Sequence, residues 1–133
     1  MKKRQTKNDI RPTIFEEKEV RKVWHNEQWY FAVVDVVAIL TRSVDPGAYW
    51  RKLKERLSKE GGNETVTKCH GLKMVAEDGK MRLIDAGNLE VIFRIIQSIP
   101  SPKAEPFKQW LARVGQDRIE EIQDPERAIV RAK

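Results

Sequence analysis

The stretch from Trp29 to Lys59 constrains the fold of this chain more than any other part of the sequence. It reads WYFAVVDVVAIL, then TRSVDPG, then AYWRKLKERLSK, which is an aromatic strand end, a short apolar segment, a turn and an amphipathic segment. Asp45 can accept hydrogen bonds from the free N–H groups of a first helical turn, and Pro46 suits the first helical position. Apolar residues then recur at near-helical spacing and predict one buried face, formed by Tyr49, Trp50, Leu53 and Leu57.

The outer face of this predicted second helix is basic. It carries Arg51, Lys52, Lys54, Arg56 and Lys59. Two helices joined by a short turn, the second apolar inside and basic outside, are what a helix-turn-helix reader of DNA requires. An ordinary amphipathic helix with solvated lysines has the same pattern, so the charge run alone leaves both interpretations open.

The distribution of charge supports a phosphate-bearing partner. The 133 residues carry a net charge of +6, and residues 1–30 and 42–60 each hold an excess of three positive charges. Lysine and arginine contacts release condensed counterions from nucleic acid, so such a surface attracts phosphates. Acidic proteins and anionic lipid would be attracted as well, and charge does not choose among the three.

Three features of the sequence place the protein in the cytoplasm. Cys69 is the single cysteine, so no disulfide framework is expected. No apolar run approaches the roughly 20 residues of a membrane span. The basic N-terminus is followed by no apolar signal core, so we expect neither secretion nor a membrane partner.

The segments before the basic helix predict an N-terminal hairpin and a short helix. A strand from Thr13 to Glu16 is expected, followed by strands over Val20–Trp24 and Gln28–Val33 around a turn at Asn26-Glu27. A helix is expected over Val34–Thr41, with Asp35 favouring its N-terminus.

The segments after the basic helix predict a second hairpin. Gly61-Gly62-Asn63 ends the helix, and Glu64 to Cys69 alternates like a strand. Gly71–Ala76 and Lys80–Ile84 flank Glu77-Asp78-Gly79, which is a strong hairpin turn.

Two helices are expected to close the core. Ala86–Ile99 has Leu89, Ile92, Phe93 and Ile96 at helical spacing, and the segment from Lys103 repeats that spacing with Phe107, Trp110, Leu111 and Val114. Pro100 and Pro102 separate the two helices. Gly115 weakens the second helix, and Asp124-Pro125 marks the start of another.

Catalytic and metal-binding patterns are weak throughout. The soft metal ligands are His25, Cys69 and His70, and the last two are adjacent, without the paired spacing of a zinc site. No nucleophile elbow and no phosphate-cradling glycine loop is present, and the acidic residues form no nuclease-like cluster. We therefore expect no enzyme activity, no cofactor and no metal, and we interpret Asp35, Asp45 and Asp85 as cap or turn residues.

The consecutive aromatics Trp29, Tyr30 and Phe31 must point to alternate faces of a strand. One of them could stack on a base, but burial in the core is the favoured interpretation, because a domain of this size needs its aromatic residues there.

Taken together, these residues resemble the BRO-N domain of baculovirus repeated-ORF proteins and prophage antirepressors. The opening of the resemblance lies in Val20-Arg21, Trp29-Tyr30-Phe31, Asp35-Val36, Ala38 and Leu40. Its close is Lys103 to Leu111, KAEPFKQWL, and MRLID at Met81–Asp85 stands where the family has a strand leading into a helix. The resemblance covers about residues 14 to 122. DAGNL at Asp85–Leu89 and VGQDRI at Val114–Ile119 depart from the usual family patterns and look like a bacterial branch, similar to DNA-damage-inducible D-type proteins.

The resemblance implies a DNA-binding module, often followed by a separate C-terminal domain, in proteins that regulate phage or damage responses. It supplies no catalytic residues.

We therefore predict an α+β domain with an N-terminal β-hairpin, two short helices of which the second is basic, a central β-hairpin, and C-terminal helices closing one core. Residues 1–12 are expected to form a flexible basic arm, with Lys2, Lys3, Arg4 and Lys7 near DNA. Residues 13–123 form the BRO-N-like DNA-binding domain, and residues 124–133 begin a further helix or a linker to a missing C-terminal region.

The expected partner is double-stranded DNA, bound by a prophage antirepressor-like or transcription-regulating protein. The predicted DNA-binding residues of the basic helix and its preceding turn are Arg42, Tyr49, Arg51, Lys52, Lys54, Arg56 and Lys59. If the N-terminal hairpin faces DNA instead, Lys18, Arg21 and Lys22 replace them. The alternative function is a protein-interaction module that binds a repressor or another regulator without DNA, through an apolar patch formed by Ile119, Ile122 and Ile129. A homo-oligomer is a further expectation left open.

Overall fold

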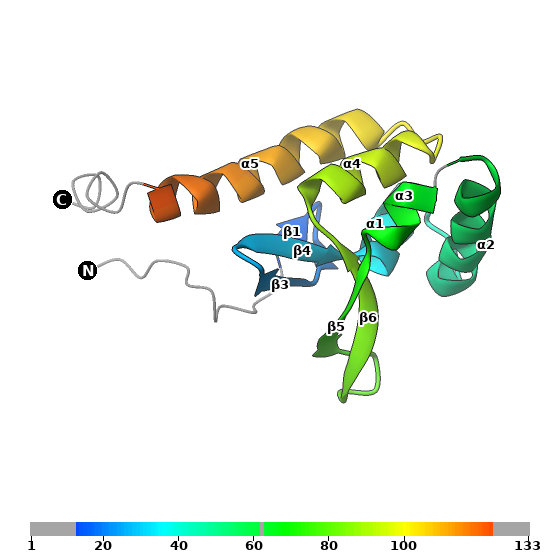
Figure 1. Cartoon of the computed structure of the whole chain (residues 1–133), viewed down its shortest axis with the longest axis horizontal. Helices are drawn as coiled ribbons and strands as arrows, with labels where there is room; N and C mark the ends of the chain where they lie inside the picture. Colours follow the sequence, from blue (N-terminus) through cyan, green and yellow to red (C-terminus); the bar gives the residue numbers. More distant parts are fainter. Residues whose placement is uncertain (1–12, 62, 124–133) are drawn as a thin grey trace.

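The computed structural model describes residues 13–61 and 63–123, and for Asn63 and residues 115–123 it describes the backbone alone. It has the predicted α+β architecture, with antiparallel strands at the N-terminal side and in the centre, and helices packed around them (Figure 1). The predicted basic arm at 1–12 and the predicted helix or linker at 124–133 lie outside the described residues.

A small two-stranded sheet begins the described chain. Strand β1 (Thr13–Phe15) pairs with β2 (Lys18–Val20), and the two-residue turn between them has positive φ at Glu16 and Glu17. The next strand, β3 (Lys22–His25), belongs to a different sheet. The prediction of a single strand over Val20–Trp24 is therefore wrong. The strand is interrupted at Arg21, whose backbone N–H donates to Asp35 instead of to a neighbouring strand.

The main sheet has four antiparallel strands in the order β3-β4-β6-β5. Strand β4 (Gln28–Ala32) follows β3 through the Asn26-Glu27 turn, and β5 (His70–Val75) and β6 (Met81–Gly87) form the central hairpin. The two predicted hairpins are joined into one sheet where Phe31 and Ala32 of β4 pair with Gly87 and Ala86 of β6.

Three helices connect the halves of this sheet. Helix α1 (Val33–Thr41) is followed by its C-cap residue Arg42, and α2 (Pro46–Lys59) begins after Asp45, whose side chain accepts from the Ala48 N–H at 3.0 Å. This cap confirms the prediction for Asp45 and Pro46. The strand predicted over Glu64–Cys69 is wrong: the segment contains the short helix α3 (Asn63–Thr67) and a connection to β5. Its alternating Thr and Val residues favour a strand, but this local propensity does not decide the conformation.

The C-terminal helices lie side by side along one side of the molecule (Figure 1). Helix α4 (Leu89–Gln97) starts three residues later than predicted, because Ala86 and Gly87 still belong to β6 and Asn88 caps the helix. Helix α5 (Ala104–Gln123) runs through Gly115 without a break.

The core lies between these helices and one face of the main sheet. Trp29 and Phe31 point into it together with Val36, Leu53 and Ile92, all of them buried. A smaller cluster covers the opposite face of the sheet and contains Tyr30, Ala32, Met74 and Ala86. Because both faces of β4 are covered, none of its three aromatic residues is exposed for base stacking, and all three are core residues as the favoured interpretation had it.

Candidate nucleic-acid interface

Helix α2 is fixed to the body by its apolar face and by one carboxylate of the sheet. Trp50 and Leu53 are buried in the core. The Trp50 indole N–H and the Lys54 ammonium both donate to Oδ2 of Asp85 on β6, at 2.8 and 3.0 Å. The interpretation of Asp85 as a cap or turn residue is therefore wrong, and its role is to hold α2 against the sheet.

The charge of Asp85 is favoured by these contacts. Desolvation alone would raise the pKa of this carboxyl, but the hydrogen bonds from Trp50 and Lys54 and the charge of Lys54 outweigh it, so the pKa lies below its ordinary value. Lys54 also lies 5.6 Å from the centroid of the Trp50 ring. Lys54 is consequently only half exposed and is bound to the body of the protein.

The opposite side of α2 carries the cations that remain directed to solvent. Arg51 and Lys52 are exposed and, among the residues described here, form no ion pair. Lys59 is exposed and lies 3.7 Å from Glu55, a pair that surface solvation makes weak. Arg56 donates to the Ser98 carbonyl at 3.0 Å, which ties the end of α2 to the end of α4.

The turn before α2 adds one more cation to this side. Arg42 has a left-handed backbone with φ of 57°, and its backbone N–H donates to the Ala38 carbonyl, closing α1. Its side chain is exposed and forms no ion pair within the described part of the chain. Val44, in the same turn, is fully exposed.

Of the predicted basic-helix residues, three contact the body of the protein. Tyr49 packs against the core and is partly buried, Lys54 is held by Asp85, and Arg56 donates to the Ser98 carbonyl. The remaining cations form an exposed basic surface, which we call the α2 surface. It consists of Arg42, Arg51, Lys52 and Lys59, with Arg56 at its edge.

The alternative cations Arg21 and Lys22 lie away from the α2 surface. The Arg21 guanidinium donates to both carboxylate oxygens of Asp35 at 2.8 Å, and to the Val75 carbonyl at 2.8 Å. These bonds to Asp35 raise the pKa of Arg21. Arg21 therefore stays protonated, and the Asp35 carboxylate balances its charge. Asp35 is thus an ion-pair partner; it lies in the first turn of α1, but the helix has no side-chain cap.

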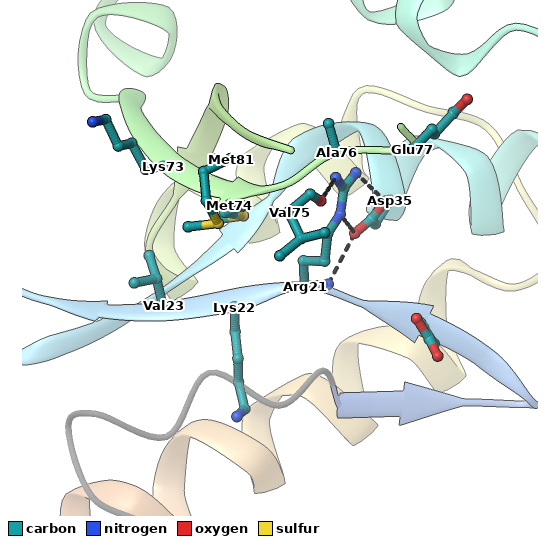
Figure 2. A pocket seen from close by; sticks show the side chains of 11 residues that line it. Arg21, Lys22, Val23, Asp35, Lys73, Met74, Val75, Ala76, Glu77 and Met81 are labelled. Atoms are coloured by element: carbon teal, nitrogen blue, oxygen red, sulfur yellow. Dashed lines mark hydrogen bonds and ion pairs between the residues drawn. The ribbon is translucent and has the colours of Figure 1, made fainter. Parts of the chain in front are cut away.

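Arg21 borders a cavity of about 520 Å³ between β3 and β5 (Figure 2). Its walls are formed largely by Val23, Met74, Val75 and Met81. The Lys22 side chain points away from this cavity (Figure 2), is only 2% exposed, and places its Nζ 4.1 Å from the centroid of the Trp29 ring. Lys22 is therefore too deeply buried to contact a duplex, and we leave both residues out of the proposed DNA surface.

Residues that could perform chemistry do not converge. Within the described ranges, no group of three or more His, Cys, Asp or Glu side chains could hold a metal ion. Burial raises the pKa of the Cys69 thiol to about 11, which keeps it protonated and unreactive as a nucleophile at neutral pH. The described part of the chain contains no helix long and apolar enough to span a bilayer.

Sequence reasoning missed one exposed surface, on the β5–β6 hairpin. Val75, Met81 and Leu83 are 48%, 54% and 70% exposed. The signal was present in the sequence. Successive residues of a strand point to opposite faces, and in this hairpin apolar residues point to both faces, so covering one face leaves the other apolar face exposed. The apolar patch predicted from Ile119, Ile122 and Ile129 lies outside the described side chains.

Comparison with known proteins gives one family. The family model described as "BRO family, N-terminal domain" matches residues 19–118. No match is found among curated proteins or among solved structures. The matched range begins in β2 and ends in α5, so it includes the whole main sheet, helix α2 and the central hairpin.

Proposed function

The chain belongs to the BRO family, whose N-terminal domain it contains at residues 19–118, and from this premise we propose that it binds duplex DNA through the α2 surface. Domains of this family are generally DNA-binding, antirepressor-like modules. The observation that carries the proposal is the placement of charge on α2, which has five basic side chains and one acidic side chain between Pro46 and Lys59. With its apolar face held by the core and by Asp85, the helix presents this excess outward.

The role of each residue follows from its exposure. Arg51 and Lys52 on the helix, with Arg42 in the turn, are free of ion pairs within the described part of the chain and would contact phosphates or base edges. An arginine near the helix start could bind the O6 and N7 acceptors of guanine, whereas lysines would mainly set the position of the protein on the backbone. Lys54, Arg56 and Tyr49 would support this surface by fixing the helix.

We further propose that the parent protein is an antirepressor-like or transcription-regulating protein of the cytoplasm, in a bacterial branch similar to DNA-damage-inducible D-type proteins. The domain acts by binding and has no enzyme activity in this proposal. A repressor protein as the partner, or a homo-oligomer, is the alternative that the following experiment separates from DNA binding.

The test is fluorescence anisotropy of a labelled duplex titrated with protein at several salt concentrations. The wild type is compared with a variant carrying Arg51→Ala, Lys52→Ala and Lys59→Ala. Each phosphate contact contributes about 0.9 to the slope of log affinity against log salt, so loss of three contacts lowers the slope by about 2.7. We expect that decrease, together with weaker binding at low salt.

The control removes the same amount of charge elsewhere. Lys68, Arg94 and Lys108 pair with acidic residues on α3, α4 and α5, and their combined substitution by alanine should leave the salt slope close to that of the wild type. Equal losses in both triple variants would mean that net charge, and not the α2 surface, determines binding. Absence of wild-type binding at every salt concentration would contradict the DNA proposal and favour a protein partner.

A further inference from the structure

The β5–β6 hairpin projects from the body on the side opposite to α4 and α5, next to the end that carries α2 (Figure 1). Residues on one face of a two-stranded ribbon are found by alternation along each strand and by direct pairing across strands. Val75 is paired with Met81, and Lys73 with Leu83. These four side chains therefore share one face, which we call the hairpin face.

The hairpin face is continuous with the site of α2. Asp85 lies two residues beyond Leu83 on β6, so its side chain belongs to the same face of the strand. This is the carboxylate that binds Trp50 and Lys54 of α2. The face that contacts α2 at the base of the hairpin thus continues outward as an exposed apolar strip. On α2, Arg51 is three residues before Lys54 and therefore lies on the same side of the helix as this contact.

The hairpin face carries one cation without an acidic partner. Lys73 is exposed and forms no ion pair among the described residues. Asp85, the acidic residue of the face within its strands, is neutralised by Lys54. At the turn, Arg82 and Asp78 are paired with each other, and the exposed residues Glu77 and Lys80 carry opposite charges.

The major groove of duplex DNA admits either a helix or a two-stranded β-ribbon. Apolar side chains at the DNA surface contact thymine methyl groups, and in the minor groove they can enter between base steps. The hairpin face offers such side chains next to a basic helix, and Leu83 is its most exposed apolar residue at 70%.

We infer that the β5–β6 hairpin is a second DNA-binding element, whose apolar face contacts the duplex beside α2. This inference rests on the proposed function. Leu83 and Met81 make apolar contact with the duplex, and Lys73 contacts a phosphate. Lys73, Val75 and Met81 also border the cavity between β3 and β5, so Leu83 is the residue that reports on the hairpin face alone, and Leu83→Thr is therefore tested singly as well as together with Met81→Thr.

Two variants separate the apolar contribution from the electrostatic one. Leu83→Thr with Met81→Thr keeps β-forming residues on the strand and is expected to weaken duplex binding about tenfold. Its salt slope should stay at the wild-type value, because these side chains release no counterions. Lys73→Ala should instead lower the slope by about 0.9.

Each variant has a matched control. Ile14 on β1 is 57% exposed and lies outside the hairpin, so Ile14→Thr should leave affinity unchanged. Arg113 on α5 is exposed, and Arg113→Ala should leave the salt slope unchanged. Thermal unfolding of every variant confirms the fold, and a benzophenone amino acid at position 83, but not at position 14, should crosslink to duplex DNA.

The outcomes distinguish the inference from the proposed function. If the wild type and the Leu83→Thr/Met81→Thr variant bind duplex equally, the hairpin inference is overturned while DNA binding through α2 stands. If the variant instead changes a self-association equilibrium in sedimentation without changing DNA affinity, the hairpin face is a protein interface and the inference is also overturned. If the wild type binds no duplex, the proposed function fails, and the inference fails with it.

Discussion

Single carboxylates hold the proposed DNA-binding elements in place. Asp85 binds the indole of Trp50 and the ammonium of Lys54, which joins α2 to β6. Asp35 binds Arg21, which also reaches the Val75 carbonyl and so joins α1 to the end of β5. Asp35 lies in the first turn of α1 as predicted, but both aspartates pair with residues distant in the chain, and neighbouring residues predict neither contact.

Replacing Asp85 by asparagine should lower the free energy of unfolding by about 1–3 kcal/mol, since asparagine keeps one acceptor oxygen but loses the negative charge that strengthens both hydrogen bonds. The pKa of Asp85 is lower in the folded protein than its ordinary value. Its contribution to stability is therefore complete above about pH 4 and is lost as the pH falls through the folded-state pKa. Urea unfolding at several pH values should show a smaller acid-induced loss of stability in Asp85→Asn than in the wild type.

The comparison needs a second aspartate variant. Asp78 pairs with Arg82 at the exposed hairpin turn, and Asp78→Asn should change stability at neutral pH much less than Asp85→Asn, because surface ion pairs contribute little. If Asp85→Asn and Asp78→Asn had the same effect at neutral pH, Asp85 would not be the residue that fixes α2.

The elements follow local sequence where the local signal is strong. Asp45-Pro46 starts α2 and Asn88 starts α4, each through a side chain that accepts a hydrogen bond from the first turn. The turns of the two N-terminal hairpins are less well matched to their sequences. Both have positive φ at two successive non-glycine residues, Glu16-Glu17 and Asn26-Glu27, where a two-residue hairpin turn favours Asn-Gly.

Glu27→Gly should therefore stabilise the protein. Glu27 has φ of 63°, a conformation that costs a non-glycine residue about 1–2 kcal/mol, whereas glycine adopts it freely but loses more entropy on folding. We expect the free energy of unfolding to rise by about 0.5–1 kcal/mol, measured as a higher urea midpoint. Glu27→Ala removes the same charge without relieving the backbone, so equal midpoints for the two variants would refute this explanation.

At the scale of the whole molecule, the decisive junction is the pairing of β4 with β6. It joins two local hairpins into one sheet and brings the aspartate of the second hairpin to the helix that follows the first. Gly87 at the end of β6 lies directly against α4, where an added Cβ would be 2.6 Å from Cγ1 of Val91. The sheet and the helix layer meet here too closely for any side chain.

Gly87→Ala should thus destabilise the protein by about 1–3 kcal/mol, because β6 or α4 must shift to admit the methyl group. Thermal or urea unfolding measures the effect. Gly71→Ala is the matched control on β5, where an added Cβ would have its nearest contact, with Leu83, at 4.0 Å. Gly71 has no positive φ, so alanine there should be neutral or slightly stabilising. A loss of stability that was the same in both variants would contradict the role assigned to the contact with Val91.

The candidate site was predictable in part. The basic excess on α2 and its apolar inner face can be read from residues 46–59, because helical periodicity is local. Which of those cations face solvent could not be read in the same way: Lys54 and Arg56 have tertiary partners on β6 and at the end of α4, and Lys22 is buried against Trp29.

The sequence by itself determined the α+β class, the limits of α2, the turns at Asn26-Glu27 and Glu77–Gly79, and the excess of positive charge, since all of these depend on residues a few positions apart. Only the tertiary structure decided that the two predicted hairpins share one sheet, that residues 63–67 form a helix despite their strand-like pattern, and which lysines and arginines are neutralised. Long-range contacts, such as Arg21 with Asp35 and Gln28 with Asn88, join residues 14 to 60 positions apart. They form only in the folded chain, so local sequence does not predict which side chains they bury or neutralise.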